Sequence, residues 1–123
     1  DVTVRVNMIN LKSNSEIRVK IFFEKVLESK FVWGLKSDDG WAICESSEFE
    51  DCQIMPFFSH EAYAKEAAIE EWDNYSPTQI SLHEFIDGWL KGMNDDKLLV
   101  GINWVNMIGS ELEPIDVAQE LSN

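Results

Sequence analysis

The sequence has few of the side chains that build metal centres and nucleophilic active sites. It contains two histidines and two cysteines among 123 residues, and neither HExxH nor CxxC spacing occurs. His60 and His83 each come just after a serine that opens a predicted helix, so we expect both to be solvent-facing residues of a first helical turn. These spacings predict no metal site.

Cys44 and Cys52 are too few for a disulfide scaffold, although they would face each other if the chain turned between them. A disulfide needs Cα atoms within about 7 Å, which a sequence does not establish. Two unpaired, buried or half-buried thiols are the interpretation that we favour, and they fit a cytoplasmic protein.

Glycine-rich and serine-centred catalytic motifs are also missing. The six glycines are scattered, which excludes a phosphate-binding loop, and no serine has a G-x-S-x-G setting. The adjacent carboxylates Asp38-Asp39 and Asp95-Asp96 lie in predicted turns, where turn chemistry explains them. The sequence therefore predicts no catalytic residue and no cofactor, and it favours a non-enzymatic protein.

Long apolar segments are absent too. No run approaches the about 20 residues of a membrane span, and no charged segment followed by an apolar one marks a signal peptide. We therefore expect no membrane association. The chain starts at Asp1 rather than Met, which is compatible with a trimmed end.

Positive charge is scarce and unevenly placed. Ten Lys and Arg stand against 23 Asp and Glu, which gives a formal net charge of −13. Residues 1–36 carry seven basic and four acidic side chains, whereas residues 45–73 carry nine acidic side chains and one lysine. This balance argues against binding to nucleic acid and permits a basic protein partner. Solubility alone also explains a negative surface.

What the sequence does contain is an aromatic hairpin in residues 31–44. The Asp-Gly pair at positions 39–40 is a strong turn signal between two β-rich runs, and we expect the turn to bring Trp33 and Trp41 near each other. Residues 52–58 are typical of a third strand. The simplest arrangement is a three-stranded antiparallel meander.

Helix caps and apolar spacing predict the remaining elements. Ser13 with Glu16, and Ser81 with Glu84, form capping boxes ahead of amphipathic segments. The other predicted features are a helix capped by Ser59 and running to Trp72, close packing at Gly88 inside the third helix, a strand over residues 97–104 with a bulge at Gly101, and a last helix from Pro114.

Together these elements predict an α+β fold, in which a small antiparallel sheet of about four strands carries three to four packed helices. Residues 1–12 form an N-terminal arm or edge strand, and residues 13–123 form a single α+β domain.

Five tryptophans supply the candidate binding residues. Trp72 is flanked in sequence by Glu66, Glu70, Glu71 and Asp73, and an aromatic ring among acids suits a cationic partner. The alternative is that Trp72 is a helix-end anchor that packs back on the core.

Several short motifs resemble one small bacterial family. They are Trp33-Gly34-Leu35, Asp39-Gly40-Trp41-Ala42, Met55-Pro56-Phe57-Phe58, Trp72-x-x-Tyr75-x-Pro77, Ile80-Ser81-Leu82-x-Glu84-Phe85 and Trp89-Leu90. The family is known as a domain of unknown function, number 2750, and the resemblance runs from about Phe22 to the C-terminus. The sequence departs from it at Phe58, where a tryptophan is usual, and in the N-terminal arm. The resemblance implies a small cytoplasmic α+β protein without a known activity, and it adds no site residues.

We therefore expect a non-enzymatic interaction module whose acidic region, residues 45–73, binds a basic protein. An immunity-type protein that neutralises a basic toxin is one concrete form. The alternative is a small-molecule-binding protein or enzyme that uses an aromatic pocket beside Trp33, Trp41 and Trp89.

Overall fold

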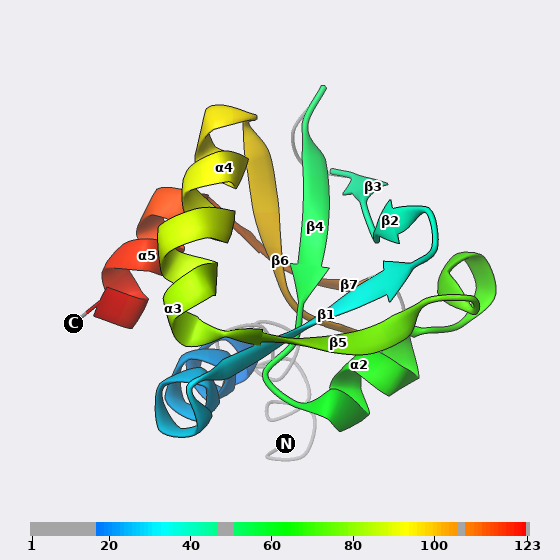
Figure 1. The fold of residues 1–123 in the computed structure, drawn as a ribbon, viewed down its shortest axis with the longest axis horizontal. Helices are drawn as coiled ribbons and strands as arrows, with labels where there is room; N and C mark the ends of the chain where they lie inside the picture. The colour runs from blue at the N-terminus through cyan, green and yellow to red at the C-terminus, as the bar shows by residue number, and fades with distance from the viewer. Residues whose placement is uncertain (1–16, 47–50, 106–107, 123) are drawn as a thin grey trace, which may run out of the picture.

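The computed structural model describes residues 17–46, 51–105 and 108–122 (Figure 1). The predicted N-terminal arm and the Ser13–Glu16 capping box lie outside these residues. The described elements are a helix over residues 17–29, β1 (Phe31–Ser37), β2 (Gly40–Trp41), β3 (Cys44–Glu45), β4 (Gln53–Phe57), α2 (Glu61–Ala67), a 3-10 helix (Glu70–Trp72), β5 (Ser76–Ser81), α3 (Leu82–Glu84), a π-helical segment (Phe85–Trp89), α4 (Leu90–Asp95), β6 (Leu98–Val105), β7 (Ile108–Leu112) and α5 (Pro114–Ser122). This mixture of helices and strands confirms the predicted α+β class.

The predicted hairpin is present and belongs to a three-stranded sheet. β1 and β2 are antiparallel with Ser37 opposite Gly40, and Gly40 has a φ of +126°, a conformation that favours glycine. β5 pairs with the other side of β1, so the strand order is β2-β1-β5. The sequence does not predict β5, because its Pro77 is typical of a turn. An edge strand tolerates a residue that lacks an N–H.

The two hairpin tryptophans lie on opposite faces of β1, so the expectation that the turn brings them together is wrong. Successive strand residues point to opposite sides. Trp33 packs with Leu35 on one side, whereas the Trp41 ring lies over Gly34 on the other. A Cβ on Gly34 would be 2.9 Å from Trp41 Cζ3, so this glycine makes room for the indole.

The second sheet has the order β3-β4-β6-β7, and its central pair, β4 with β6, is parallel. The predicted meander is therefore wrong, because β4 pairs with β3 and β6. A bridge between described residues joins the two sheets: Trp33 and Phe58 exchange N–H···O bonds of 2.8 and 2.7 Å. Both β4 and β6 are nearly continuous apolar runs, which is typical of parallel strands covered on both faces.

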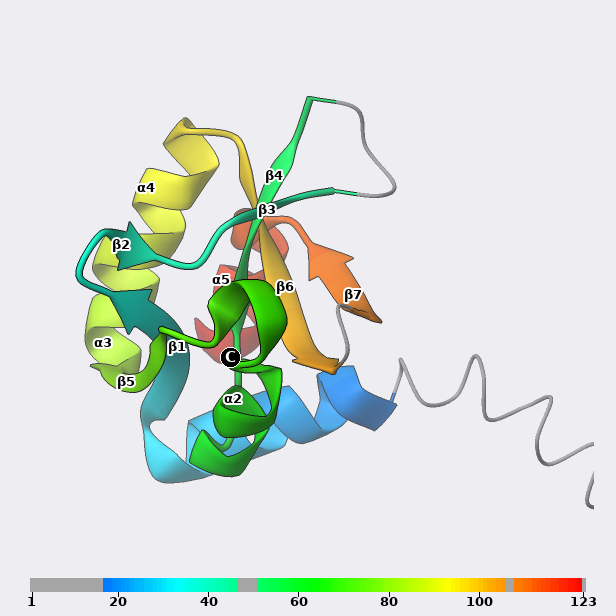
Figure 2. The same ribbon diagram turned by 90° about the vertical axis from the view of Figure 1, so that its right-hand side faces the viewer.

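The β4–β6 pair separates two hydrophobic core clusters. Met55 and Phe57 of β4 point to the first core cluster, which also contains Phe22, Phe85, Leu90 and Val117. Ile54 and Phe58 point to the second core cluster, which also contains Leu35, Ala64, Trp72 and Trp104. Figures 1 and 2 show α4 and α5 on one side of β4 and β6, and α2 on the other.

The helix over residues 82–95 begins as predicted. Ser81 Oγ accepts a hydrogen bond of 3.2 Å from the N–H of Glu84. Its middle is π-helical, since the N–H of Leu90 donates to the carbonyl of Phe85, five residues earlier. The expected close packing at Gly88 is wrong, because a Cβ built there would meet no atom within 4 Å. A glycine inside a helix costs about 1 kcal/mol of stability relative to alanine. No packing contact at Gly88 offsets this cost, because the space around it is open.

The helix predicted from Ser59 is shorter and starts one residue later. Its N-cap is His60, and Ser59 itself is only 2% exposed and donates its N–H to Asn103 Oδ1 at 2.8 Å. α2 ends at Ala67, and the chain then turns through Glu70, whose φ of +53° is rare outside glycine. The prediction of Ser59 as the N-cap is wrong, because Ser59 bonds to Asn103, 44 positions away. Local sequence spacing does not reveal such a contact.

Gly101 lies at a close approach of β4 and β6. A Cβ built there would be 2.9 Å from both Ile54 Cγ2 and Trp104 Nε1. The irregularity predicted at this glycine instead falls between Ile102 and Val105, where Asn103 has a φ of +45°. The glycine therefore serves the packing of the parallel pair.

We predict that Gly101→Ala lowers the free energy of unfolding by about 1–3 kcal/mol, because Ile54 and Trp104 must both move. Urea denaturation measures this change. Gly88→Ala is the matched control, with open space around its Cβ, and it should raise stability by up to about 1 kcal/mol. Equal effects of the two substitutions would contradict this account of Gly101.

Candidate functional site

The four acidic residues predicted around Trp72 all reach the surface. Glu66 lies on α2, Glu70 and Glu71 on the 3-10 helix, and Asp73 directly after it, and all four are exposed. We call these four residues the acidic face. They lie within eight positions of the chain, so the sequence alone is sufficient to bring them together.

The carboxylates of the acidic face have no cationic partner in the described part of the chain. The one ion pair on α2 joins Lys65 Nζ to Glu61 Oε1 at 3.9 Å. In contrast, Lys20 and Lys25 on the helix over residues 17–29 pair with acids of the same helix, at 3.9 and 3.7 Å. The negative charge of the acidic face is therefore uncompensated.

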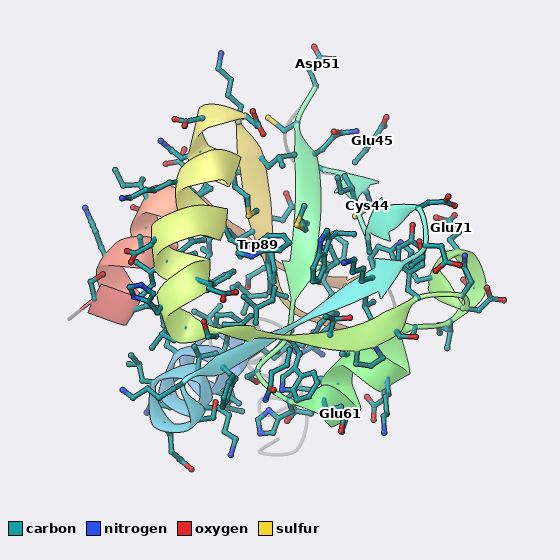
Figure 3. The ribbon with its side chains drawn as sticks, viewed as in Figure 1. Cys44, Glu45, Asp51, Glu61, Glu71 and Trp89 are labelled. Atoms are coloured by element: carbon teal, nitrogen blue, oxygen red, sulfur yellow. The ribbon has the colours of Figure 1, made fainter. Side chains whose placement is uncertain are left out.

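A carboxylate from one further strand, β7, lies near this region, where it acts on Cys44. Burial raises the pKa of the Cys44 thiol to about 11, and the negative charges of Glu111 on β7 and Glu71 on the 3-10 helix add to the effect. Figure 3 shows Cys44, Glu45 and Glu71 on the same side of the molecule. Acidic side chains from β7 and the 3-10 helix thus lie near one half-buried thiol.

Two exposed isoleucines lie next to Cys44 and Glu70 in the chain. Ile43, next to Cys44, is 42% exposed, and Ile69, next to Glu70, is 47% exposed. Burying apolar side chains in an interface gives a favourable free energy of binding. The surrounding charges orient the partner.

The tryptophans predicted for the sites are placed differently. Trp72 is only 4% exposed and lies in the second core cluster, which matches the interpretation of this residue as a core anchor. Trp41 and Trp89 meet edge to face, with ring centroids 4.5 Å apart. Trp33 packs against the second core cluster, on the opposite side of β1, and therefore shares no pocket with them.

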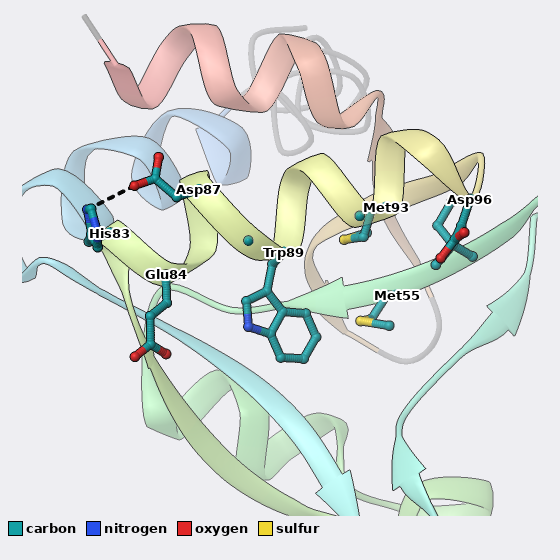
Figure 4. A pocket seen from close by; sticks show the side chains of 10 residues that line it. Met55, His83, Glu84, Asp87, Trp89, Met93 and Asp96 are labelled. Atoms are coloured by element: carbon teal, nitrogen blue, oxygen red, sulfur yellow. Dashed lines mark ion pairs between the residues drawn. The ribbon is translucent and has the colours of Figure 1, made fainter.

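A surface groove runs beside the helix over residues 82–95 (Figure 4). It has a volume of about 680 Å³, and its apolar lining comes from Met55, Trp89, Met93 and Leu98. Of the three tryptophans expected beside a pocket, Trp89 lines this groove, whereas Trp33 and Trp41 do not. A further local signal is the pair Gly88 and Gly92 within an otherwise amphipathic helix.

Ser59, His60 and Asn103 form a cluster that resembles a nucleophilic site. Ser59 Oγ is 2.8 Å from His60 Nδ1, and Asn103 Nδ2 donates to Ser59 Oγ at 3.0 Å. Burial, and secondly the charge of Lys25, lower the pKa of His60. However, Ser59 and Asn103 are each only 2% exposed, so a substrate does not reach the hydroxyl. The cluster ties the end of β4 to β6.

Within the described residues, no three His, Cys, Asp or Glu side chains are grouped to hold a metal ion. Among the same residues, no helix has the length and apolarity that a bilayer crossing requires. Cys44 and Cys52 are both free thiols.

These features define a small α+β protein with an uncompensated acidic face and a separate apolar groove. The chain belongs to the family described as Protein of unknown function (DUF2750), whose family model matches residues 19–121. The resemblance found in the sequence motifs is thereby confirmed. No match was found among curated proteins or among solved structures.

We predict that Cys44 reacts slowly with iodoacetamide in a Cys52→Ser background. Its pKa of about 11 leaves roughly a hundredfold less thiolate than an unperturbed cysteine near neutral pH. Adding Glu71→Gln and Glu111→Gln should lower this pKa and speed alkylation, which mass spectrometry follows. Glu113→Gln with Glu120→Gln is the matched control and should change nothing. An alkylation rate that is insensitive to Glu71 and Glu111 would contradict the convergence of charge at Cys44.

Proposed function

We propose that this protein is an interaction module whose acidic face, Glu66, Glu70, Glu71 and Asp73, binds a basic protein. The observation that carries the proposal is the set of exposed carboxylates without cationic partners among the described residues. Grouping uncompensated like charges costs stability through repulsion, and a basic partner relieves this cost. An immunity-type protein that neutralises a basic toxin is one concrete form.

The chemistry of such a surface sets the kind of binding. Negative charges in water attract a positive partner over about a Debye length, which is about 8 Å at physiological salt. They raise the association rate more than they slow dissociation. Ile69, next to Glu70 in the chain, is exposed and supplies apolar contact area. Trp72 supports this surface from below as a core residue rather than as a contact.

The alternative function, a small-molecule pocket lined by tryptophans, has one observation in its favour. Trp89 lines the groove beside the helix over residues 82–95, and the groove volume of about 680 Å³ falls in the range of ligand sites. Trp33 and Trp41 do not line the groove. Six lining residues are exposed, so the groove opens at the surface: His83, Glu84, Asp87, Gly88, Gly92 and Asp96.

We predict that Glu66→Lys with Glu71→Lys abolishes capture of the basic partner. The experiment is affinity capture from a lysate of the source organism, followed by purification of the captured protein and measurement of its association rate. Two charge reversals in the acidic face should lower that rate about tenfold or more at low salt. Raising the salt should weaken binding of the wild type in the same way, because screening acts on the same charges.

Glu113→Lys with Glu120→Lys is the control, since it makes the same change in net charge on two exposed residues, Glu113 just before α5 and Glu120 on it. This variant should bind as the wild type does. The proposal fails if the two variants weaken binding equally, because net charge rather than the acidic face would then be responsible. It also fails if no basic protein is captured at low salt.

A further inference from the structure

The groove beside the helix over residues 82–95 combines an apolar floor with an acidic rim. Met55, on β4, is 8% exposed and Met93 is 3% exposed, so both sulfur-containing side chains present only their tips. Figure 4 shows Trp89, Met93 and Met55 between this helix and β4, with Glu84 near one end and Asp96 at the other. Methionine side chains adapt to differently shaped apolar ligands, which makes such a floor suited to a peptide.

Gly88 and Gly92 keep the groove open. A Cβ built on either glycine would meet no atom within 4 Å, so neither residue is required by packing. Neither has a positive φ, so neither is required by the backbone conformation. Glycine at two positions of one helix destabilises that helix relative to alanine. Their one physical consequence in the structure is free space above the floor of the groove.

The first of these glycines, Gly88, lies in the π-helical segment Phe85–Trp89. The hydrogen bond from Leu90 to Phe85 spans five residues, and both side chains are buried, at 2% and 0% exposure. The wider turn therefore keeps both in the first core cluster, while Asp87 and Gly88 between them are exposed. Interruptions of this kind are frequent at functional sites of helices.

The rim of the groove is acidic and mostly uncompensated. Asp87 pairs with His83, with Nδ1 and Oδ2 3.1 Å apart, and the His83 side chain is 85% exposed. Glu84 and Asp96 have no ion pair in the described part of the chain. Lys91 and Lys97 are exposed nearby but do not line the groove.

We propose that this groove binds a cationic amphipathic peptide segment of a basic protein partner. Leucine-like side chains lie on Met55, Trp89 and Met93, and lysine or arginine side chains pair with Glu84 and Asp96. Charge complementarity with the rim, together with the apolar floor, favours this occupant over a small neutral ligand. The inference rests on the proposed function only for the sign of the partner's charge, and it places the contact on other elements than the acidic face.

The experiment uses a fluorescein-labelled leucine–lysine peptide that forms an amphipathic helix, with fluorescence anisotropy as the readout. The wild type should bind this peptide and should not bind a leucine–glutamate peptide of the same design. Gly88→Leu with Gly92→Leu fills the groove and should weaken binding about tenfold or more. Its melting temperature should not fall, because leucine is the better helix former and the space is open.

Asn94→Leu is the matched control, because it adds a leucine to an exposed position of the same helix outside the groove. It should bind the peptide as the wild type does, and so should Glu66→Lys with Glu71→Lys. Amide chemical shifts of Gly88 and Gly92 in ¹⁵N-labelled protein should move on titration with the peptide.

Unchanged affinity of the groove-filling variant would overturn the inference, as would equal binding of the leucine–glutamate peptide. Loss of peptide binding in the acidic-face variant, with the groove-filling variant intact, would also overturn it and leave the proposed function standing. Binding of dodecyltrimethylammonium that displaces the peptide at equal concentration would assign the groove to a small cation instead. Peptide binding in the groove without any partner at the acidic face would refute the proposed function alone.

Discussion

The parallel pairing of β4 with β6 is the constraint on which the rest of the structure depends. Both strands are covered on both faces, so each needs apolar residues at successive positions, and the two core clusters lie on either side of them. A parallel pair also requires a long crossover connection. The segment between the two strands, residues 58–97, supplies it and contains α2, β5 and the helix over residues 82–95. The acidic face and the helix beside the groove both belong to this connection, whereas Met55 and Leu98 of the groove come from β4 and β6.

This origin explains why two unrelated surfaces occur in so short a chain. The part of the crossover on the second core cluster buries Trp72 and leaves its acidic neighbours in water. The part on the first core cluster buries Phe85 and Leu90 and leaves Gly88 and Gly92 exposed. Each surface is the solvent-facing side of a segment whose apolar side chains are buried in one of the two core clusters. In the helix over residues 82–95, Gly88 and Gly92 lower helical stability at positions where a Cβ would meet no atom within 4 Å.

Much of the acidic face could be predicted from the sequence, whereas the groove could not. Carboxylates avoid burial without a partner, so the exposure of Glu66, Glu70 and Glu71 follows from their chemistry. The groove needs Met55 beside Met93, two residues from separate elements that meet only after β4 has paired with β6. Trp72 shows the limit of local reasoning, because its sequence neighbours are acids while its spatial neighbours are apolar.

The sequence by itself determined the features that depend on neighbours a few positions away. The hairpin turn at Gly40, the cap at Ser81 and the start of α5 at Pro114 are of this kind, since each depends on a single residue's φ or hydroxyl. Only the tertiary structure decided which strand pairs with β4, and that Ser59 bonds to Asn103. These outcomes depend on contacts between distant segments, where many pairings satisfy the same local preferences and only the burial of the whole apolar surface selects one.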